Sequence, residues 1–140
     1  MVTGETMERL TIGEVAKRAG VNLQTLRYYE RRRLLQAPPR TASNYRIYPA
    51  DAVLRVQFIK RAQELGFSLR EIEELLSLRA APRARCADVR RRAELKLKDI
   101  DERVRTLRAM GGALSGLIAE CAGKKPVSEC PILESFDSTR

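Results

Sequence analysis

The sequence contains no histidine and no tryptophan, and aromatic residues make up only 5% of its 140 residues. Without histidine, the commonest general base is missing, so no cysteine or serine can be activated by an imidazole. The chain also has neither a Cys-Xaa-Xaa-Cys pair nor a Gly-rich phosphate-binding loop. These absences argue against an enzyme such as a cysteine-dependent hydrolase or a metal detoxifier.

Long hydrophobic runs are also missing. No run of about 18 apolar residues occurs, which excludes a transmembrane helix. Residues 1–8 are neither basic nor apolar enough for a signal peptide, so we expect a cytoplasmic protein without a membrane partner. The three cysteines cannot all pair within one chain, and in a reducing compartment they stay thiols. Metal binding or redox chemistry is therefore favoured over structural disulfides.

Positive charge dominates the chain and is concentrated near its beginning. The formal net charge is +9, and residues 7–48 contain nine Lys or Arg against three Glu. Such a concentration is typical of a surface that binds nucleic acid. The alternative, which charge alone does not exclude, is a basic surface that contacts only solvent.

Two short helices are predicted in the first third of the chain, at about residues 12–31. Thr11 and Glu14 form a capping-box pair that begins the first helix, and Gly20 ends it. Asn22 is a good cap for the second helix, which carries the apolar Leu26. Two helices joined in this way predict a helix-turn-helix, although many unrelated helical pairs share the spacing.

The second helix of this pair is expected to contact DNA. Arg27 can bind a guanine edge or a phosphate. Tyr28 and Tyr29 are adjacent and cannot face the same way, so only one of them can pack into the core. The side chains that we expect at the DNA are Thr11, Lys17, Arg18, Gln24, Thr25, Arg27, Tyr28, Tyr45 and Arg46.

A wing and a second helix pair are predicted to follow. Residues 36–48 are rich in turn formers and end in an alternating stretch, 45–48, that predicts one strand of a two-stranded wing, ended by Pro49. Apolar spacing predicts a helix over residues 50–65, and Ser68 with Glu71 caps another. Residues 9–79 are thus expected to form a mainly α winged helix-turn-helix domain, with its helix pair at 50–79.

The stretch after Cys86 has the heptad pattern of a coiled coil. Apolar or small residues recur at alternating spacings of four and three: Ala93, Leu97, Ile100, Val104, Leu107, Gly111, Leu114 and Ile118. The pattern predicts one helix over residues 88–120, about 50 Å long at about 1.5 Å per residue. Such a helix needs a partner, most simply its copy in a homodimer. A loop at 121–131 and a short helix complete the segment 86–137.

Several motifs together resemble the MerR family of transcription regulators. They lie at residues 10–21, 25–30, 45–48, 58–69 and 71–76, so the resemblance covers nearly the whole chain. It implies a winged helix-turn-helix, a second helix pair and a long antiparallel dimerisation helix. One departure is Arg33, where the family usually has Gly; a left-handed conformation there would cost about 1 kcal/mol.

The cysteine spacing resembles the mercury-responsive members of that family, and lead- and cadmium-responsive members have similar spacing. Cys86, Cys121 and Cys130 form an all-sulfur ligand set that suits Hg(II), with Pb(II) or Cd(II) as competitors; Zn(II) normally takes four ligands. In an antiparallel dimer, Cys86 of one chain lies beside the other two cysteines of its partner, which gives two shared sites. The alternatives are redox sensing or packing of cysteines as small buried residues. No organic cofactor is expected.

The resemblance also implies a mechanism. The homodimer is expected to stay on a palindromic promoter operator with and without metal, and to repress without it. Binding of Hg(II) would then distort the double-stranded DNA so that RNA polymerase can start a mercury-resistance operon. A lead- or cadmium-responsive regulator, or a thiol-redox regulator, remains as the alternative.

Overall fold

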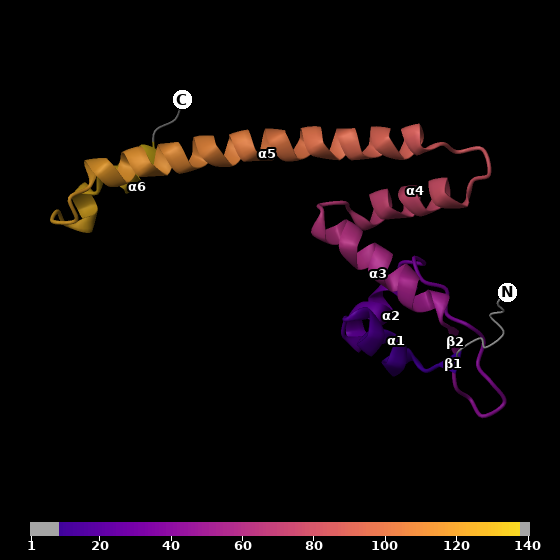
Figure 1. Cartoon of the computed structure of the whole chain (residues 1–140). Helices are drawn as coiled ribbons and strands as arrows, with labels where there is room; N and C mark the ends of the chain where they lie inside the picture. Colours follow the sequence, from indigo (N-terminus) through magenta and orange to yellow (C-terminus); the bar gives the residue numbers. More distant parts are fainter. Residues whose placement is uncertain (1–8, 138–140) are drawn as a thin grey trace. The chain divides into compact units, whose positions relative to one another are not determined.

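The computed structural model describes residues 9–137 and confirms a mainly α-helical protein (Figure 1). The chain forms two compact units: an N-terminal unit that extends to Arg92 and a C-terminal unit that begins at Ala93. The elements of the N-terminal unit are β1 (Arg9–Leu10), α1 (Ile12–Ala19), α2 (Leu23–Arg31), β2 (Tyr48–Pro49), α3 (Asp51–Glu64) and α4 (Leu69–Ala80). Helix α5 (Cys86–Glu120) runs from this unit into the second, where η1 (Val127–Glu129) and α6 (Pro131–Asp137) follow.

Local capping begins the first two helices where the sequence predicts. The Thr11 hydroxyl accepts a hydrogen bond from the Glu14 amide at 3.2 Å, and the Glu14 carboxylate accepts one from the Thr11 amide at 2.8 Å. The Asn22 side chain accepts one from the Thr25 amide at 2.7 Å. Each contact satisfies an amide that the helix itself leaves unpaired, so the predicted helix-turn-helix forms.

Three helices of the N-terminal unit end in the same left-handed turn. Gly20 has φ 74° after α1, and Gly66 has φ 97° after α3. Arg33 holds the equivalent position after α2 with φ 61°. There the Leu34 amide donates to the Tyr29 carbonyl at 2.9 Å and the Arg33 amide donates to the Glu30 carbonyl at 3.0 Å. This hydrogen-bond pattern is a Schellman motif, which favours glycine at the position that Arg33 occupies.

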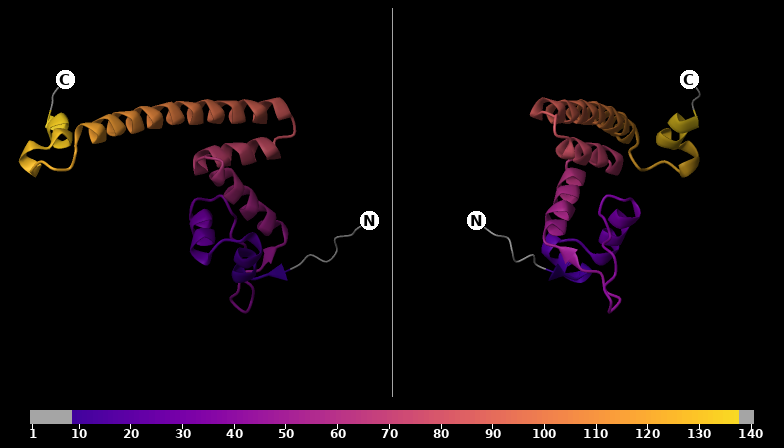
Figure 2. Two further views of the ribbon diagram at one scale, coloured as in Figure 1. Left: turned by 60° about the vertical axis from the view of Figure 1, so that its left-hand side comes forward. Right: turned by 90° about the vertical axis from the view of Figure 1, so that its right-hand side faces the viewer.

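One hydrophobic core holds the N-terminal unit together. Helix α1 packs on α2 and α3, and α3 packs on α4 (Figure 2). Its most deeply buried large side chains are Val15, Leu26, Leu34, Tyr48, Val56, Ile59 and Ile72, which come from α1 to α4, β2 and the turn after α2. The core therefore fixes how the two helices of the helix-turn-helix lie on the second helix pair.

The predicted second pair of helices is present with small changes at its ends. Helix α3 begins at Asp51 and ends at Glu64. The predicted capping box begins α4, because the Ser68 hydroxyl accepts from the Glu71 amide at 3.1 Å and the Glu71 carboxylate accepts from the Ser68 amide at 2.8 Å.

The predicted strand over residues 45–48 is wrong in its extent and in its partner. Only Tyr48 and Pro49 form β2, and they pair antiparallel with Leu10 and Arg9 of β1. Within the wing, a single bridge joins Arg40 to Arg46. Pro38 and Pro39 lie just before the bridge in the chain and have no amide hydrogen to donate, so a ladder cannot extend through them.

The long helix α5 begins at Cys86, two residues before the predicted start. The Asp88 carboxylate accepts a hydrogen bond from the Arg85 amide at 2.9 Å, which satisfies an amide at the helix start. In this single chain the heptad positions are open to solvent: Leu107 is 63% exposed and Ile118 is 64% exposed. The short helix predicted over residues 131–137 is α6 (Figure 2).

None of the helices in residues 9–137 combines the length and the apolar character that a membrane span requires.

Candidate DNA-binding face and cysteine site

Helix α2 separates a buried face from a basic, exposed face. Leu26 and Tyr29 are buried against the core, whereas Gln24, Arg27 and Tyr28 are exposed. This division follows from the helical period, because residues three apart share a face and adjacent residues do not. The exposed face has the side-chain types that bind base edges and phosphates.

The two adjacent tyrosines take different roles, as the sequence requires. Tyr29 is 2% exposed, and its hydroxyl donates to the Gln63 side-chain oxygen of α3 at 2.6 Å. Burial raises the pKa of Tyr29, so its hydroxyl remains a donor at neutral pH. Tyr28 points outward, where the Arg31 and Arg32 guanidinium carbons lie 5.7 and 5.8 Å from its ring centroid.

Helix α3 fixes the helix-turn-helix through side chains that cap backbone carbonyls. The Lys60 ammonium donates to the carbonyl of Gly20, in the turn between α1 and α2, at 2.9 Å. The Arg55 side chain donates to the carbonyl of Leu34, just after α2, at 2.9 Å. Together with the contact between Tyr29 and Gln63, these bonds hold both ends of α2 on α3. The exposed face of α2 is thus carried on a rigid support.

A partly buried hydrogen bond links β2 to α2. The Tyr48 hydroxyl is fully buried and donates to the Glu30 carboxylate. Burial raises the pKa of Tyr48 far above its ordinary value, and the hydrogen bond to Glu30 raises it further. Arg46 and Arg27 act in the opposite direction, lowering this pKa through their positive charges. The Tyr48 hydroxyl therefore remains protonated and ties the base of the wing to the helix that carries Arg27.

The wing places one predicted DNA contact in solvent and partly buries another. Tyr45 is exposed. Arg46 is half-buried, and its guanidinium donates to the Pro38 carbonyl, so part of its hydrogen-bonding capacity shapes the wing. The Arg40 guanidinium donates to the Asn44 carbonyl at 3.2 Å.

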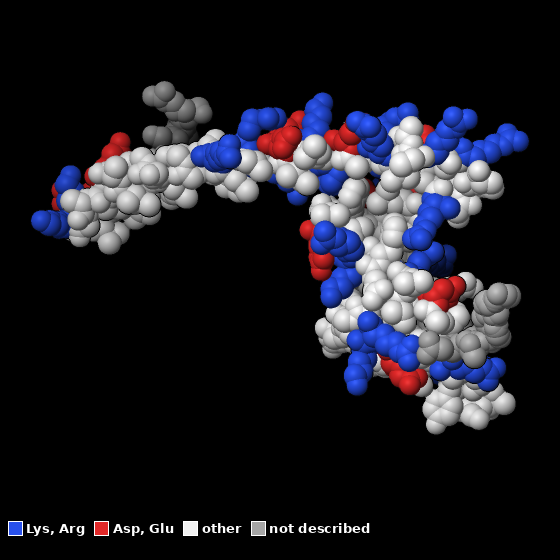
Figure 3. Space-filling model, in the orientation of Figure 1, with Lys and Arg blue, Asp and Glu red and all other residues white. Residues whose placement is uncertain are grey.

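The remaining predicted contacts lie on α1 and at the start of α2. Lys17 and Arg18 are exposed in the last turn of α1, Thr25 is half-buried, and the Thr11 hydroxyl caps α1. The structure thus brings all nine predicted side chains onto one compact unit. Figure 3 shows basic atoms distributed over this unit with few acidic atoms between them.

Sequence reasoning did not single out the residues that support this face. Glu30, Lys60 and Gln63 act through partners that are 18, 40 and 34 residues away in the chain. No local spacing marks such contacts. The only signal was indirect: Tyr28 and Tyr29 are adjacent, so one of them had to be buried and to need a hydrogen-bond partner.

The three cysteines are free thiols at the two ends of α5. Cys86 is the first residue of the helix and is exposed. Cys121 directly follows the helix and is half-buried, as is Cys130 between η1 and α6. Within residues 9–137, no three potential ligands of one chain lie close enough to hold a metal ion. The exposure of Cys86 argues against a packing role for this thiol in the isolated chain.

The chemistry of the cysteines fits a soft metal ion. The chain contains no histidine, so its soft ligands are these three thiols and three methionines. None of the cysteines is consumed in a disulfide. The set is one ligand short of the usual zinc site and suits three-coordinate thiolate binding.

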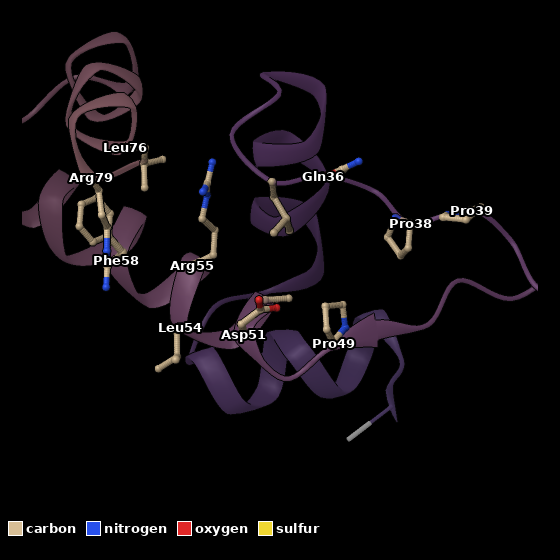
Figure 4. Close-up of a pocket in the computed structure, with 12 residues that line it drawn as sticks. Gln36, Pro38, Pro39, Pro49, Asp51, Leu54, Arg55, Phe58, Leu76 and Arg79 are labelled. Carbon is tan, nitrogen blue, oxygen red and sulfur yellow. The ribbon is translucent and has the colours of Figure 1, made fainter. Parts of the chain in front are cut away.

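A groove in the N-terminal unit lies between the base of the wing, α3 and α4 (Figure 4). Its volume is about 580 Å³, and its lining is mixed, with apolar residues such as Leu54 and Phe58 beside polar ones such as Gln36 and Asp51. Of its two arginines, Arg55 donates to a backbone carbonyl and Arg79 stacks at 5.4 Å on the Phe58 ring. Both arginines of the groove therefore make structural contacts. The residues that line the groove do not include a set of side chains arranged for catalysis.

The fold and the basic helix face define a helix-turn-helix transcription regulator rather than an enzyme. Residues 10–78 match the family described as MerR HTH family regulatory protein, and residues 53–117 match the family described as MerR, DNA binding. The chain belongs to the MerR family of transcription regulators.

Individual relatives agree with this assignment. The chain is 42% identical over 128 residues to the mercuric resistance operon regulatory protein of Bacillus cereus, a match that covers 91% of this chain and 97% of the relative. Its fold is similar to that of the transcription regulator PbrR691 of Ralstonia metallidurans CH34 in complex with lead(II), with TM-score 0.81, 33% identity and coverage of 91% and 98%. It is also similar to MerR of Bacillus megaterium MB1 in complex with mercury(II), with TM-score 0.71, 39% identity and coverage of 92% and 100%.

Proposed function

We propose that this protein is a metal-responsive regulator that binds a promoter operator as a homodimer and senses Hg(II). The observation that carries the proposal is the placement of three free thiols at the two ends of one long, solvent-exposed helix. At about 1.5 Å per residue, the 35 residues of α5 span about 50 Å. One chain cannot bring Cys86 to Cys121 across that helix, but two antiparallel chains can.

The open heptad positions of α5 support the dimer. Ile100, Val104, Leu107, Leu114 and Ile118 are all exposed in the single chain. Burial of a Leu or Ile side chain stabilises an assembly by about 1.5–3 kcal/mol, so leaving this stripe in water is unfavourable. An antiparallel pair of α5 helices covers the stripe and places Cys86 of one chain near Cys121 and Cys130 of the other. Two symmetry-related metal sites result.

The relatives support mercury as the sensed metal. Several proteins more than 40% identical to this chain are named mercuric resistance operon regulatory proteins. A mercury(II) complex is among the structures with a similar fold. Hg(II) is soft and binds thiolates in preference to harder ligands, which matches a site made of sulfur alone.

The DNA response follows from the rigid support of α2. Each α2 would enter the major groove of one half-site, with Arg27 and Gln24 toward base edges and Tyr45 toward the backbone. Without metal the dimer represses the promoter. A metal ion shared between chains biases the relative pose of the two rigid N-terminal units, which distorts the DNA so that RNA polymerase can engage it.

A lead-responsive regulator is the second candidate. The similarity of the fold to that of PbrR691 in complex with lead(II) supports it. Three thiolates can also hold Pb(II) or Cd(II). The fold and the cysteines are the same for each metal, so only a comparison of metals separates these candidates.

A promoter reporter titrated with Hg(II), Pb(II), Cd(II) and Zn(II) tests the proposal. We expect Hg(II) to induce transcription at the lowest concentration and Zn(II) to induce it least. A Cys86→Ser variant should lose induction and still repress, since the DNA-binding face is unchanged. Stronger induction by Pb(II) would select the second candidate, and normal induction of Cys86→Ser by Hg(II) would disprove the three-cysteine site.

A further inference from the structure

Arginine residues crowd the chain around Cys86. Residues 79–92 contain six arginines and one acidic residue, Asp88. Cys86 is exposed in the middle of this segment, and Arg90 lies four residues further along α5, on the same helix face. Figure 3 shows basic atoms gathered along this part of the molecule.

Some of these arginines have structural contacts. Arg92 forms an ion pair with Glu74 of α4 at 2.8 Å, and Arg79 stacks on Phe58 at 5.4 Å. These contacts account for the position of both side chains.

Arg83 and Arg85 have no such role. Both are exposed, and within residues 9–137 neither side chain forms a hydrogen bond, an ion pair or a ring contact. The only acid nearby in the chain is Asp88, whose carboxylate accepts from the Arg85 amide at 2.9 Å and lies 3.9 Å from Arg91. In the single chain, the two exposed guanidinium groups directly before Cys86 therefore lack a partner among residues 9–137, and packing does not explain them.

We propose that Arg83 and Arg85 attract the sensed metal in the form of an anionic thiolate complex and direct it to Cys86. This inference rests on the proposed function, because it requires Cys86 to bind a thiophilic metal. A soft metal ion in a thiol-rich medium is carried by low-molecular-weight thiols. Each glutathione carries two carboxylates and one ammonium group, so the mercury complex with two glutathione thiolates has a net charge of about −2 at neutral pH. A cluster of exposed cations raises the rate at which such an anion reaches the site.

The exchange at Cys86 balances without an oxidant or a reductant. The Cys86 thiol loses its proton, its sulfur bonds to the metal, and one carrier thiolate leaves and takes up a proton. The other two cysteines then displace the second carrier thiolate in the same way. Three cysteine protons are released in total; two protonate the departing carriers and one passes to solvent.

The experiment varies the charge of the carrier and of the protein. The double variant Arg83→Gln/Arg85→Gln is compared with the full-length wild type, with the charge-preserving Arg83→Lys/Arg85→Lys, and with Arg105→Gln/Arg108→Gln. The last pair loses the same charge from a part of α5 that is about 28–33 Å from Cys86 and about 20–24 Å from Cys121 of the same chain, in both cases beyond the screening length of about 10 Å. The rate of metal uptake is followed by the ultraviolet absorbance of the mercury–thiolate bonds, with Hg(II) supplied as its glutathione, 2-mercaptoethanol or cysteamine complex.

We expect Arg83→Gln/Arg85→Gln to slow uptake from the anionic glutathione complex about threefold to tenfold. Uptake from the neutral 2-mercaptoethanol complex should be unchanged, and uptake from the cationic cysteamine complex should be faster. The lysine variant and the Arg105/Arg108 control should match wild type, and high salt should remove the difference. Operator binding and final stoichiometry should be unaffected.

Equal slowing with all three carriers, or no slowing with glutathione, overturns the inference and leaves the proposed function intact. A wild-type protein that takes up no Hg(II) from any carrier overturns both.

Discussion

Arg33 adopts a left-handed backbone conformation in a turn whose two counterparts contain glycine. Its φ of 61° compares with 74° at Gly20 and 97° at Gly66. In that conformation a Cβ approaches the following carbonyl oxygen, at a cost of about 1 kcal/mol. The turn forms nevertheless, because the Leu34 amide bonds to the Tyr29 carbonyl and both side chains are buried. Tertiary packing therefore holds Arg33 in a conformation that its own side chain disfavours.

Replacement of Arg33 by glycine should stabilise the protein. We expect Arg33→Gly to raise the free energy of unfolding by up to about 0.6 kcal/mol, because a steric cost of about 1 kcal/mol disappears and the entropy that glycine adds to the unfolded chain offsets about 0.4 kcal/mol or more of it. Urea denaturation at one fixed protein concentration measures the change. The adjacent Arg32→Gly is the matched control: Arg32 has φ −84°, so glycine there should lower stability. A lower stability for Arg33→Gly would contradict the strain argument.

At the scale of the element, α5 carries two different surfaces in succession. Charged residues are dense from Arg90 to Arg108, and no charged residue occurs from Ala109 to Ala119 (Figure 3). The apolar stripe continues through both parts and is exposed in the single chain. A helix of this length is stabilised mainly by packing of such a stripe rather than by its own propensity. The dimer that we propose would provide that packing.

A charge placed in the stripe should break the dimer. We expect Leu107→Lys to weaken dimerisation at least about 100-fold, because two buried leucines are lost per dimer at about 1.5–3 kcal/mol each. Analytical ultracentrifugation over a range of concentrations measures the dissociation constant. Ala109→Lys adds the same charge two residues further, outside the heptad stripe, and should leave the dimer intact. An unchanged dissociation constant for Leu107→Lys would show that this stripe is not the interface.

At the scale of the whole molecule, the metal site that we propose to be shared between two chains predicts complementation between two defective chains. A dimer of a Cys86→Ser chain with a Cys121→Ser chain has one site with two substitutions and one intact site. Each homodimeric variant has no intact site. We therefore expect the mixed dimer, purified through two different affinity tags, to bind one Hg(II) in the presence of competing thiol, and both homodimers to bind none.

The matched control places both substitutions on one chain and pairs it with wild type. In the antiparallel arrangement each site then loses one cysteine, so this dimer should bind no Hg(II). If each chain bound metal with its own cysteines, the wild-type chain would retain a site and the control would bind one. The two dimers contain the same substitutions, and mass spectrometry of the metal complexes distinguishes the outcomes.

The local features of this protein could be predicted from its sequence because their causes are local. Thr11 with Glu14, and Ser68 with Glu71, are three residues apart, and each pair begins its helix as predicted. The heptad stripe predicted α5 to within two residues, since a single period specifies one face of a helix. The number and spacing of the cysteines also follow directly from the sequence, and the all-sulfur ligand set based on them stays a prediction.

Only the tertiary structure decided the features that depend on contacts between distant segments. It paired β2 with β1 rather than extending the wing hairpin, and it buried Tyr29 while leaving Tyr28 exposed. It also joined Tyr48 to Glu30 and Lys60 to the carbonyl of Gly20. Each of these contacts forms when packing of the core buries a polar group that then needs a hydrogen-bond partner. The partner comes from a distant part of the chain, and no spacing in the sequence indicates which residue it is.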